Sequence, residues 1–435
     1  MFLLPILIDM YSRIWSLSIG ILLSLSVCAQ YDPSGGIYPD AVFSETIKTV
    51  RLYKADWETS YPIGRIEDEM PLELTFDELS KTARNYSYTI VHCDADWRQS
   101  RLIPSDYMDG FTVNQIRDYK YSFNTLIPYV HYRISIPNED VLLKVSGNFV
   151  VLVFEDSKDD RPILCKRFCI TESMVAVSAV AIRARQTALQ DEWQQIDFTV
   201  NTANYPVENA YQDVKVTIIQ NGQWHTALTG IRPLFVRQNE LDYRQEKANL
   251  FRAGNEFRPL DTKSTRFTST RMTAIEFKQP TYHFYPYADE SRNAGRYLFY
   301  EDFNGKYAIQ SEKTNQPNIE ADYVYVHFTL RSPQPLDNGQ VYVAGAFCND
   351  ACTPENLMTY NAGNGHYEAT ILLKQGYYNY KYVFLPFKNP AIDDTKLEGS
   401  FNDTENDYII CVYHRGRSSR YDRLVGVSVV NTMRR

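Results

Sequence analysis

Residues 323–330 read Tyr-Val-Tyr-Val-His-Phe-Thr-Leu, and this stretch decides the fold class. Every second residue, from Val324 to Leu330, is apolar, whereas the residues between them carry hydroxyl or imidazole groups. A period of two places successive side chains on opposite faces of a strand, so the pattern predicts a half-buried β-strand. The same alternation recurs in residues 367–373 and 378–384.

Short alternating segments continue in both directions along the chain. Toward the C-terminus, residues 409–413 are expected to complete a compact sandwich. Toward the N-terminus, alternating segments begin near residue 47 and again near residue 174, and turn-forming residues separate them. We therefore predict an all-β protein of three consecutive, immunoglobulin-like β-sandwich domains.

The composition agrees with this fold class and excludes some functions. The 435 residues include 33 Tyr, 22 Phe and 5 Trp, and aromatic residues favour pleated, half-buried strands. Hydrophobic residues make up 44%, which excludes an intrinsically disordered chain. The net charge of 45 − 53 = −8 argues against a general nucleic-acid-binding protein, which needs a basic surface.

Changes in composition along the chain predict the domain limits. We expect a first sandwich at residues 30–172 and a second, with long irregular loops, at residues 173–309. Residues 310–320 (QSEKTNQPNIE) form a polar run that is typical of a linker. The third sandwich then occupies residues 321–435.

The N-terminus predicts export. Residues 14–27 are uncharged, and these 14 residues are short for a transmembrane helix of ~20 but typical of a signal peptide. We expect residues 1–29 to be this signal peptide, cleaved near Ala29/Gln30. Acylation of Cys28 is the alternative, although Val27 before it fits a lipoprotein signal poorly. No other stretch is long and apolar enough to span a membrane.

Six cysteines remain after cleavage. Cys165 and Cys169 lie in an extended apolar pattern, where four residues span ~13 Å, beyond the ~7 Å limit for a disulfide. We expect both to point into a core. Cys348 and Cys352 lie in the loop-like stretch CNDACTP, where a disulfide is possible. The spacing of these two pairs is a weak match to a zinc site.

The densest polar cluster lies at residues 92–96, His-Cys-Asp-Ala-Asp. On a continuous strand, His92, Asp94 and Asp96 would share a face and suit a divalent cation, while Cys93 would face the other way. A strand end followed by a turn explains the same residues.

No recognised catalytic or metal-binding motif is present elsewhere in the chain. Asp393-Asp394 and the acids of residues 402–405 resemble hairpin turns more than a calcium loop, which needs further oxygen ligands. We therefore predict no catalytic, cofactor-binding or metal-binding residue.

Four arginines lie close together near the C-terminus, namely Arg415, Arg417, Arg420 and Arg423. A local basic patch on an acidic protein suits an acidic partner or anionic lipid headgroups. The alternative is a solvated turn in which Asp422 pairs with one of the arginines.

Nine short motifs occur in an order and spacing that resemble one family. They are TVRL at residues 49–52, LTFDEL at 74–79, YTIVHCDADW at 88–97, YMDGF at 107–111, YKYSFNT at 119–125, PNED at 137–140, GNEFR at 254–258, GYYNYKYV at 376–383 and RYDRLV at 420–425. Together they resemble the type IX secretion system plug protein of the Bacteroidota, from about residue 46 to residue 425.

The resemblance implies a function without catalysis. A member of this family is expected to be periplasmic and peripherally associated with the outer membrane. It would close the periplasmic opening of a large outer-membrane β-barrel translocon in the resting state, as a monomer in a complex with that barrel. The resemblance implies no cofactor and no nucleic acid.

The third segment also looks like the early-set sandwich of glycogen-binding modules. Residues 341–347 (VYVAGAF) are similar to the start of such a module, but Cys348-Asn349-Asp350 follows where an Asn-x-Trp is usual. An exported carbohydrate-binding protein is therefore the first alternative function. An exported hydrolase that uses His92 or Cys93 is the second.

Overall fold

The computed structural model describes residues 36–68, 70–156 and 161–433. The predicted signal peptide, its cleavage site and Cys28 lie outside the described residues. No helix in the described ranges is both long and apolar enough to cross a membrane. The chain is all-β, as the alternation predicts, and its mostly antiparallel sheets pack face to face around three buried apolar clusters.

The first pair of sheets, here the first lobe, uses residues 36–172. One sheet has the order β1-β12-β11-β5-β7 with β3 beside β12, and the other has the order β2-β4-β9-β8. The elements are β1 (Ala41–Val42), β2 (Ile47–Lys54), β3 (Ile63–Arg65), β4 (Leu72–Glu78), β5 (Tyr86–Cys93), α1 (Pro104–Tyr107), β6 (Met108–Gly110), β7 (Asn114–Gln115), β8 (Asp118–Tyr121), β9 (Val130–Ile136), β10 (Val141–Leu143), β11 (Gly147–Glu155) and β12 (Pro162–Thr171).

Strand β11 shows why this sheet is apolar on both faces. Phe149, Val151 and Val153 point into the core of the first lobe, whereas Val150 and Leu152 point into a second buried cluster on the other side. A strand that is covered on both faces needs a continuous apolar run rather than alternation.

The second lobe uses residues 173–253 together with residues 407–433. Its sheets have the orders β13-β14-β18-β17, with β19 beside β14, and β16-β15-β30-β31. The elements are β13 (Ala176–Arg183), β14 (Trp193–Asn201), α2 (Ala210–Asp213), β15 (Val214–Gln220), η1 (Trp224–Thr226), β16 (Leu228–Ile231), β17 (Phe235–Arg237), β18 (Glu240–Asp242), β19 (Leu250–Arg252), β30 (Asp407–His414) and β31 (Arg423–Asn431).

The third lobe uses residues 254–406. Its sheets have the orders β20-β29-β24, with β26 beside β29, and β21-β22-β25-β28-β27, with β23 beside β25. The elements are β20 (Arg258–Asp261), β21 (Met272–Lys278), β22 (Thr281–Pro286), β23 (Asp289–Glu290), β24 (Tyr307–Ile309), α3 (Pro317–Glu320), β25 (Tyr323–Arg331), β26 (Gly339–Ala344), η2 (Ala346–Cys348), β27 (Thr359–Asn361), β28 (His366–Lys374), β29 (Gly376–Pro386) and α4 (Thr395–Glu398).

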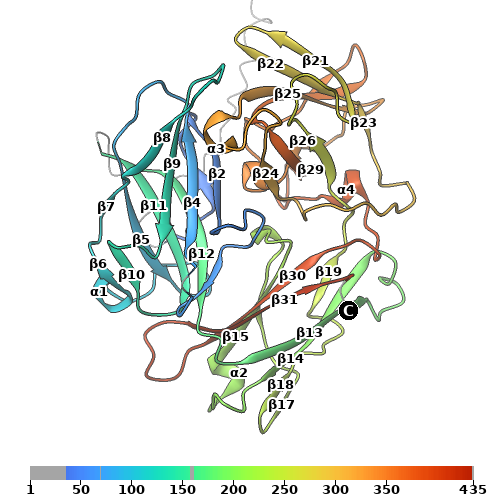
Figure 1. Ribbon diagram of the computed structural model, residues 1–435. Coiled ribbons are helices and arrows are strands. Elements are labelled where there is room, and N and C mark those ends of the chain that lie inside the picture. Colours follow the sequence, from blue (N-terminus) through green and yellow to red (C-terminus); the bar gives the residue numbers. More distant parts are fainter. Residues whose placement is uncertain (1–35, 69, 157–160, 434–435) are drawn as a thin grey trace, which may run out of the picture. The chain divides into compact units, whose positions relative to one another are not determined.

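The sheets cross the expected domain limits. Strand β30, expected to complete the third sandwich, instead pairs with β15 of the second lobe, with Val412 opposite Val216. Figure 1 shows β30 and β31, in red, beside the green β15. Strands β20 and β24, expected in the second sandwich, pair with β29 of the third lobe. The alternation of a strand specifies its buried face but not its hydrogen-bonding partner, so the sequence pattern missed these exchanges.

The run expected as a linker is packed against its neighbours. The backbone N–H of Gln310 donates to the carbonyl of Gln375, and that of Phe123 in the first lobe donates to the carbonyl of Ile319. Residues 317–320 form the short helix α3.

An apolar cluster joins the first and second lobes. It contains Cys93, Cys165 and Cys169 from the first lobe and Ile409 and Cys411 from the second, all buried. The prediction that Cys165 and Cys169 point into a core is therefore confirmed. Through such contacts the described residues belong to one compact unit rather than to three separate domains.

Candidate functional site

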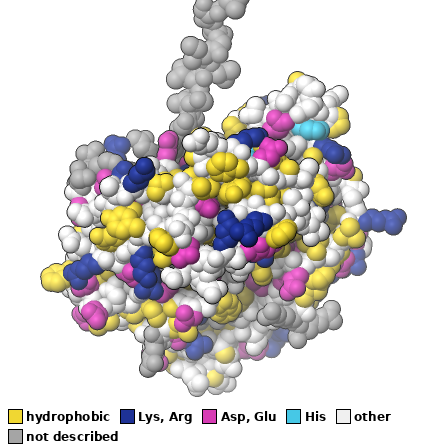
Figure 2. All heavy atoms as spheres, turned by 45° about the horizontal axis from the view of Figure 1, so that its top comes forward, with side chains coloured by type: hydrophobic (Ala, Val, Ile, Leu, Met, Phe, Trp, Pro, Cys, Tyr) yellow, Lys and Arg dark blue, Asp and Glu magenta, His cyan; other side chains and the backbone are white. Residues whose placement is uncertain are grey.

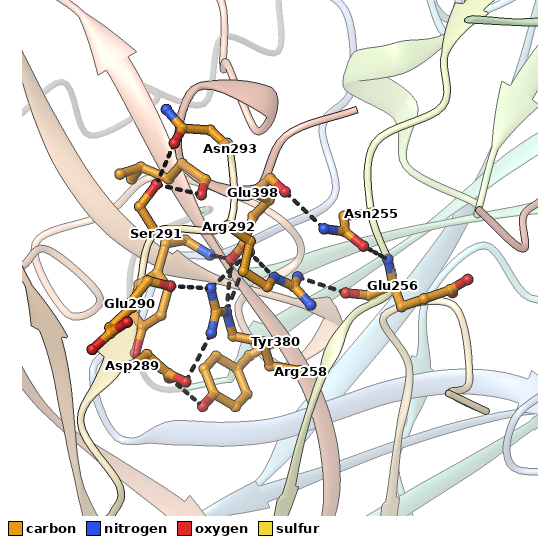
Figure 3. Close-up of polar contacts among 12 residues, drawn as sticks. Asn255, Glu256, Arg258, Asp289, Glu290, Ser291, Arg292, Asn293, Tyr380 and Glu398 are labelled. Atoms are coloured by element: carbon orange, nitrogen blue, oxygen red, sulfur yellow. Dashed lines mark hydrogen bonds and ion pairs between the residues drawn. The ribbon is translucent and has the colours of Figure 1, made fainter. Parts of the chain in front are cut away.

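Arg258, from the GNEFR motif, is the centre of a buried ion-pair network in the third lobe. It begins β20, and its side chain is 5% exposed. Its Nη1 lies 2.8 Å from Asp289 Oδ1 and its Nη2 lies 2.9 Å from Glu398 Oε2. Figure 3 shows the guanidinium between these two carboxylates. A guanidinium presents several N–H donors in one plane, so one arginine can bind carboxylates from two other segments and hold β20, β23 and α4 together.

Further residues satisfy the remaining polar groups around Glu398. Arg292 donates from Nε to the Glu398 carboxylate at 2.7 Å and from Nη2 to the backbone carbonyl of Glu256 at 2.7 Å. Asn255 donates from Nδ2 to the backbone carbonyl of Glu398 at 2.8 Å (Figure 3). Tyr380 donates its hydroxyl to Asp289 Oδ2 at 2.7 Å.

The electrostatics of this network make it structural rather than reactive. Burial disfavours charge on Arg258, but the two carboxylates outweigh it and raise the Arg258 pKa. Burial also disfavours charge on Glu398, but Arg258 and Arg292 hold the Glu398 pKa below its ordinary value. The groups therefore stay ionised at neutral pH and fix the positions of three chain segments.

A second buried network joins the first lobe to the third. Asp77 of β4 is fully buried, and its Oδ1 lies 2.6 Å from His131 Nδ1 of β9. Its Oδ2 lies 2.6 Å from Lys374 Nζ of β28 and accepts from the Tyr323 hydroxyl of β25 at 2.7 Å. The Tyr323 hydroxyl is also 2.6 Å from Thr49 Oγ1. One carboxylate thus contacts both lobes.

Burial works against both charges of the Asp77–Lys374 pair. It lowers the Lys374 pKa to about 8, despite the opposing attraction of Asp77. At Asp77, burial is outweighed by Lys374 and His131, which hold the carboxyl pKa below its ordinary value. The pair is consequently ionised at neutral pH, and separating the two lobes would leave the Lys374 ammonium without its carboxylate.

A cavity of about 260 Å³ lies beside this junction, between β8, β9 and the residues around α3. His131, Arg133 and Asn318 are among its lining residues. Its volume lies below the ~300 Å³ at which pockets for drug-sized ligands begin.

His92 and Cys93, weighed as catalytic residues, face opposite sides of β5. His92 Nε2 lies 3.1 Å from the carbonyl oxygen of Ser146, and its Nδ1 lies 2.8 Å from Ser100 Oγ. Because a carbonyl only accepts, Nε2 carries the proton and Nδ1 accepts from Ser100. Burial lowers the His92 pKa to about 4 and raises the Cys93 thiol pKa. The structure forms no Cys–His pair from them.

The same geometry separates His92, Asp94 and Asp96, the residues that would suit a divalent cation on a continuous strand. His92 is buried, whereas Asp96 lies on the surface with its carboxylate 3.1 Å from Arg98. Asp94 instead pairs with Arg415. In the other candidate calcium stretch, Asp394 lies 2.5 Å from Lys381. These acids therefore have protein partners.

Three of the four clustered arginines pair with acids of the first lobe. Arg415 contacts Asp94, Arg420 lies 2.8 Å from Asp106, and Arg423 contacts Glu172. Arg415 also lies 2.9 Å from Asp422, as the turn interpretation proposes. Arg417 is exposed and forms no ion pair with a described residue. A role for these arginines as an interaction patch stays a prediction.

Cys348 and Cys352 lie in one small apolar cluster with Tyr342 and Val383. Both are free thiols in the structure, and Cys348 Sγ lies 3.1 Å from the carbonyl oxygen of Gly345. A disulfide between them stays a prediction.

The tyrosines of the GYYNYKYV motif do not form a sugar-stacking surface. Three of its four tyrosines, Tyr378, Tyr380 and Tyr382, are each at most 1% exposed and belong to the core of the third lobe, and the fourth, Tyr377, is half-buried. Large apolar side chains that are exposed lie elsewhere in the chain. The most exposed are Phe111, Phe267, Leu298 and Phe387. On the face that Figure 2 shows, apolar side chains lie among charges of both signs.

Sequence reasoning missed the two buried networks. Asp77 interrupts the apolar strand pattern LTFDE, and Lys374 ends the apolar strand pattern TILLK. A charged residue in such a pattern indicates a buried charge that has a partner. The partners themselves lie far away in the sequence, since Lys374 and Asp77 are 297 residues apart.

A comparison with known families agrees with the resemblance over the first lobe. A family model described as "Type 9 secretion system plug protein 1st domain" matches residues 47–172. A crystal structure of a hypothetical protein from Parabacteroides merdae is 34% identical, with a TM-score of 0.88, over 91% of this chain and 100% of that one.

Two other comparisons give no further information about the family. A crystal structure of native alpha-2-macroglobulin from Escherichia coli, spanning domains NIE-MG1, aligns at 12% identity over 46% of this chain and 89% of that one. Its TM-score of 0.17 is too low to carry an argument. The search of curated proteins found no match.

Proposed function

The chain belongs to the type 9 secretion system plug protein family, and on this premise we propose that it closes a translocon. It would seal the periplasmic opening of the large outer-membrane β-barrel of that system when no cargo passes. The observation that carries the proposal is the match of residues 47–172 to the first plug domain. The proposal includes export to the periplasm, peripheral association with the outer membrane and no catalytic step.

The internal construction supports a mechanical role. A plug has to keep its shape against the opening it seals, so its lobes must not move apart easily. Here the first lobe is joined to the third by the ionised Asp77–Lys374 pair and to the second by an apolar cluster. At the latter junction, Trp97 and Trp224 meet edge to face at 4.7 Å between ring centroids.

The surface supports a reversible contact. A plug has to leave when cargo arrives, so its interface should be no larger than that of an ordinary protein–protein complex. It should also be polar enough for the released plug to stay in solution. Exposed apolar side chains among charges of both signs suit such an interface (Figure 2). Cargo would then open the barrel by its differential affinity for the unplugged state.

Co-purification tests the partner. Tagged protein captured from gently solubilised outer membranes should bring down one very large β-barrel protein. A tagged protein that migrates only as a free monomer on native gels of the same extract contradicts the proposal.

A leakage assay tests the closure itself. The purified barrel in vesicles loaded with fluorescent dextran should leak, and added plug protein should slow the leak. Substituting Arg417→Glu together with Arg420→Glu examines the predicted basic patch, and Arg266→Glu together with Arg296→Glu, at two other exposed positions, is the control with the same change in charge. Equal leakage with and without the wild-type protein would refute closure.

A further inference from the structure

Three acidic residues from distant parts of the chain converge where the second and third lobes meet. Glu256 precedes β20, Asp302 precedes β24, and Glu405 precedes β30. One carboxylate oxygen from each lies within 4.8 Å of the others. Oxygen ligands on opposite sides of a Ca²⁺ ion, each at 2.3–2.6 Å, are about 5 Å apart, so the spacing suits this ion.

Buried oxygen atoms without partners point to a ligand in the same place. Glu256 is 1% exposed, and its Oε2 has no hydrogen-bond partner among the described residues. Asn304 is 7% exposed; its amide group lies against Glu405, with Nδ2 3.2 Å from Oε2, and its Oδ1 also has no partner in the described chain. Buried polar atoms are normally satisfied, so the unpartnered oxygen of Glu256 within the carboxylate cluster, and that of the neighbouring Asn304, require an explanation.

The rest of the surroundings hold the acids in place without neutralising them. The Tyr297 hydroxyl donates to Glu256 Oε1 at 2.5 Å, and the backbone N–H of Phe257 donates to Asp302 Oδ2 at 2.5 Å. Lys306 makes its ion pair with Asp407, at 3.9 Å, and its charge also attracts Glu405 and Asp302. These three acids and Glu256 outnumber this lysine.

We propose that Glu256, Asp302 and Glu405 bind a divalent cation, with Ca²⁺ preferred, and that the Asn304 amide, whose Nδ2 faces Glu405, turns its oxygen toward the ion. All the donors are oxygen atoms, which favours Ca²⁺ or Mg²⁺ over Zn²⁺ or copper. Ca²⁺ accepts irregular sets of six to eight oxygen ligands, whereas Mg²⁺ demands near-ideal octahedral geometry, so acids supplied by three separate chain segments favour Ca²⁺. All four residues belong to the third lobe, and Glu405 lies two residues before β30 of the second lobe, so the ion would hold the chain at the border between the two lobes.

Titration calorimetry of the full chain after removal of metal by a chelator tests the proposal. We expect one Ca²⁺ per chain at neutral pH, with a Kd on the order of 10⁻⁴ M, and weaker Mg²⁺ binding. Asp302→Asn should weaken Ca²⁺ binding by about tenfold or more. Asp403→Asn, which removes the same charge from an exposed neighbour, should leave the Kd within about threefold.

A second measurement keeps the test valid if Asp302→Asn folds poorly. Tb³⁺ replaces Ca²⁺ at oxygen sites, so its tyrosine-sensitised luminescence should appear with the wild-type protein and decline as Ca²⁺ is added. Asn304→Ala, which keeps all three acids, should weaken this luminescence signal.

Two results would overturn the inference. One is the absence of Ca²⁺ binding up to roughly 5 mM, above the weakest range for extracellular calcium modules. The other is equal binding by the wild type and Asp302→Asn, which would place the ion elsewhere. Failure here would leave the proposed plug function intact, since co-purification of the barrel is measured separately.

Discussion

Replacing Arg258 with Met tests whether the buried network of Figure 3 holds the third lobe together. Methionine keeps most of the apolar stem but removes the guanidinium that contacts Asp289 and Glu398. Both acids are at most 4% exposed, and each keeps one other arginine, Arg271 or Arg292. Removing one partner of a buried ion pair costs ~3–5 kcal/mol, so Arg258→Met should cost about 3 kcal/mol.

Arg271→Met is the matched control for this substitution. Arg271 contacts the same Asp289, at 2.6 Å, but its side chain is 43% exposed. An exposed ion pair contributes at most ~1 kcal/mol, so the control should be destabilised far less than Arg258→Met. The free energy of unfolding is measured by urea denaturation followed by circular dichroism.

The pH dependence gives a second check on the same variant. The Glu398 pKa is held below its ordinary value, so the stability from this group is present above the unfolded pKa and is lost as the pH falls. The difference in the free energy of unfolding between the wild type and Arg258→Met should therefore become smaller as the pH falls from 7 toward 4. Equal costs for Arg258→Met and Arg271→Met, or a difference that widens in acid, would refute the reasoning.

Three further predictions follow from buried groups. Asp77→Asn leaves the Lys374 ammonium without its carboxylate and should cost about 3 kcal/mol, seen as a lower calorimetric melting temperature; an unchanged temperature would contradict this. Burial lowers the His92 pKa to about 4, so the urea midpoint of the wild type should decrease from pH 6.5 to pH 4, and that of His92→Gln should decrease much less. Parallel pH profiles of the two proteins would contradict this prediction. Maleimide should label the buried thiols Cys165 and Cys411 only after unfolding, whereas rapid labelling of the folded protein would show that their cluster is open.

The strands and their buried faces were predictable because they depend on local alternation. The apolar positions of residues 323–330 are buried in β25, and the opposite faces of His92 and Cys93 follow from the same period of two. The core positions of Cys165 and Cys169 came from strand geometry alone. The family resemblance likewise came from short motifs in order, and the match over residues 47–172 agrees with it.

Tertiary structure alone decided which strands pair and which charges meet. Strand β30 could have completed either sandwich, since its alternation suits any apolar sheet, and the structure pairs it with β15. Arg258 lies 31 residues from Asp289 and 140 from Glu398, and no periodic pattern connects such positions. A local pattern reports which face of a strand avoids water, whereas a buried charge is stable only beside a partner that the folded chain brings to it.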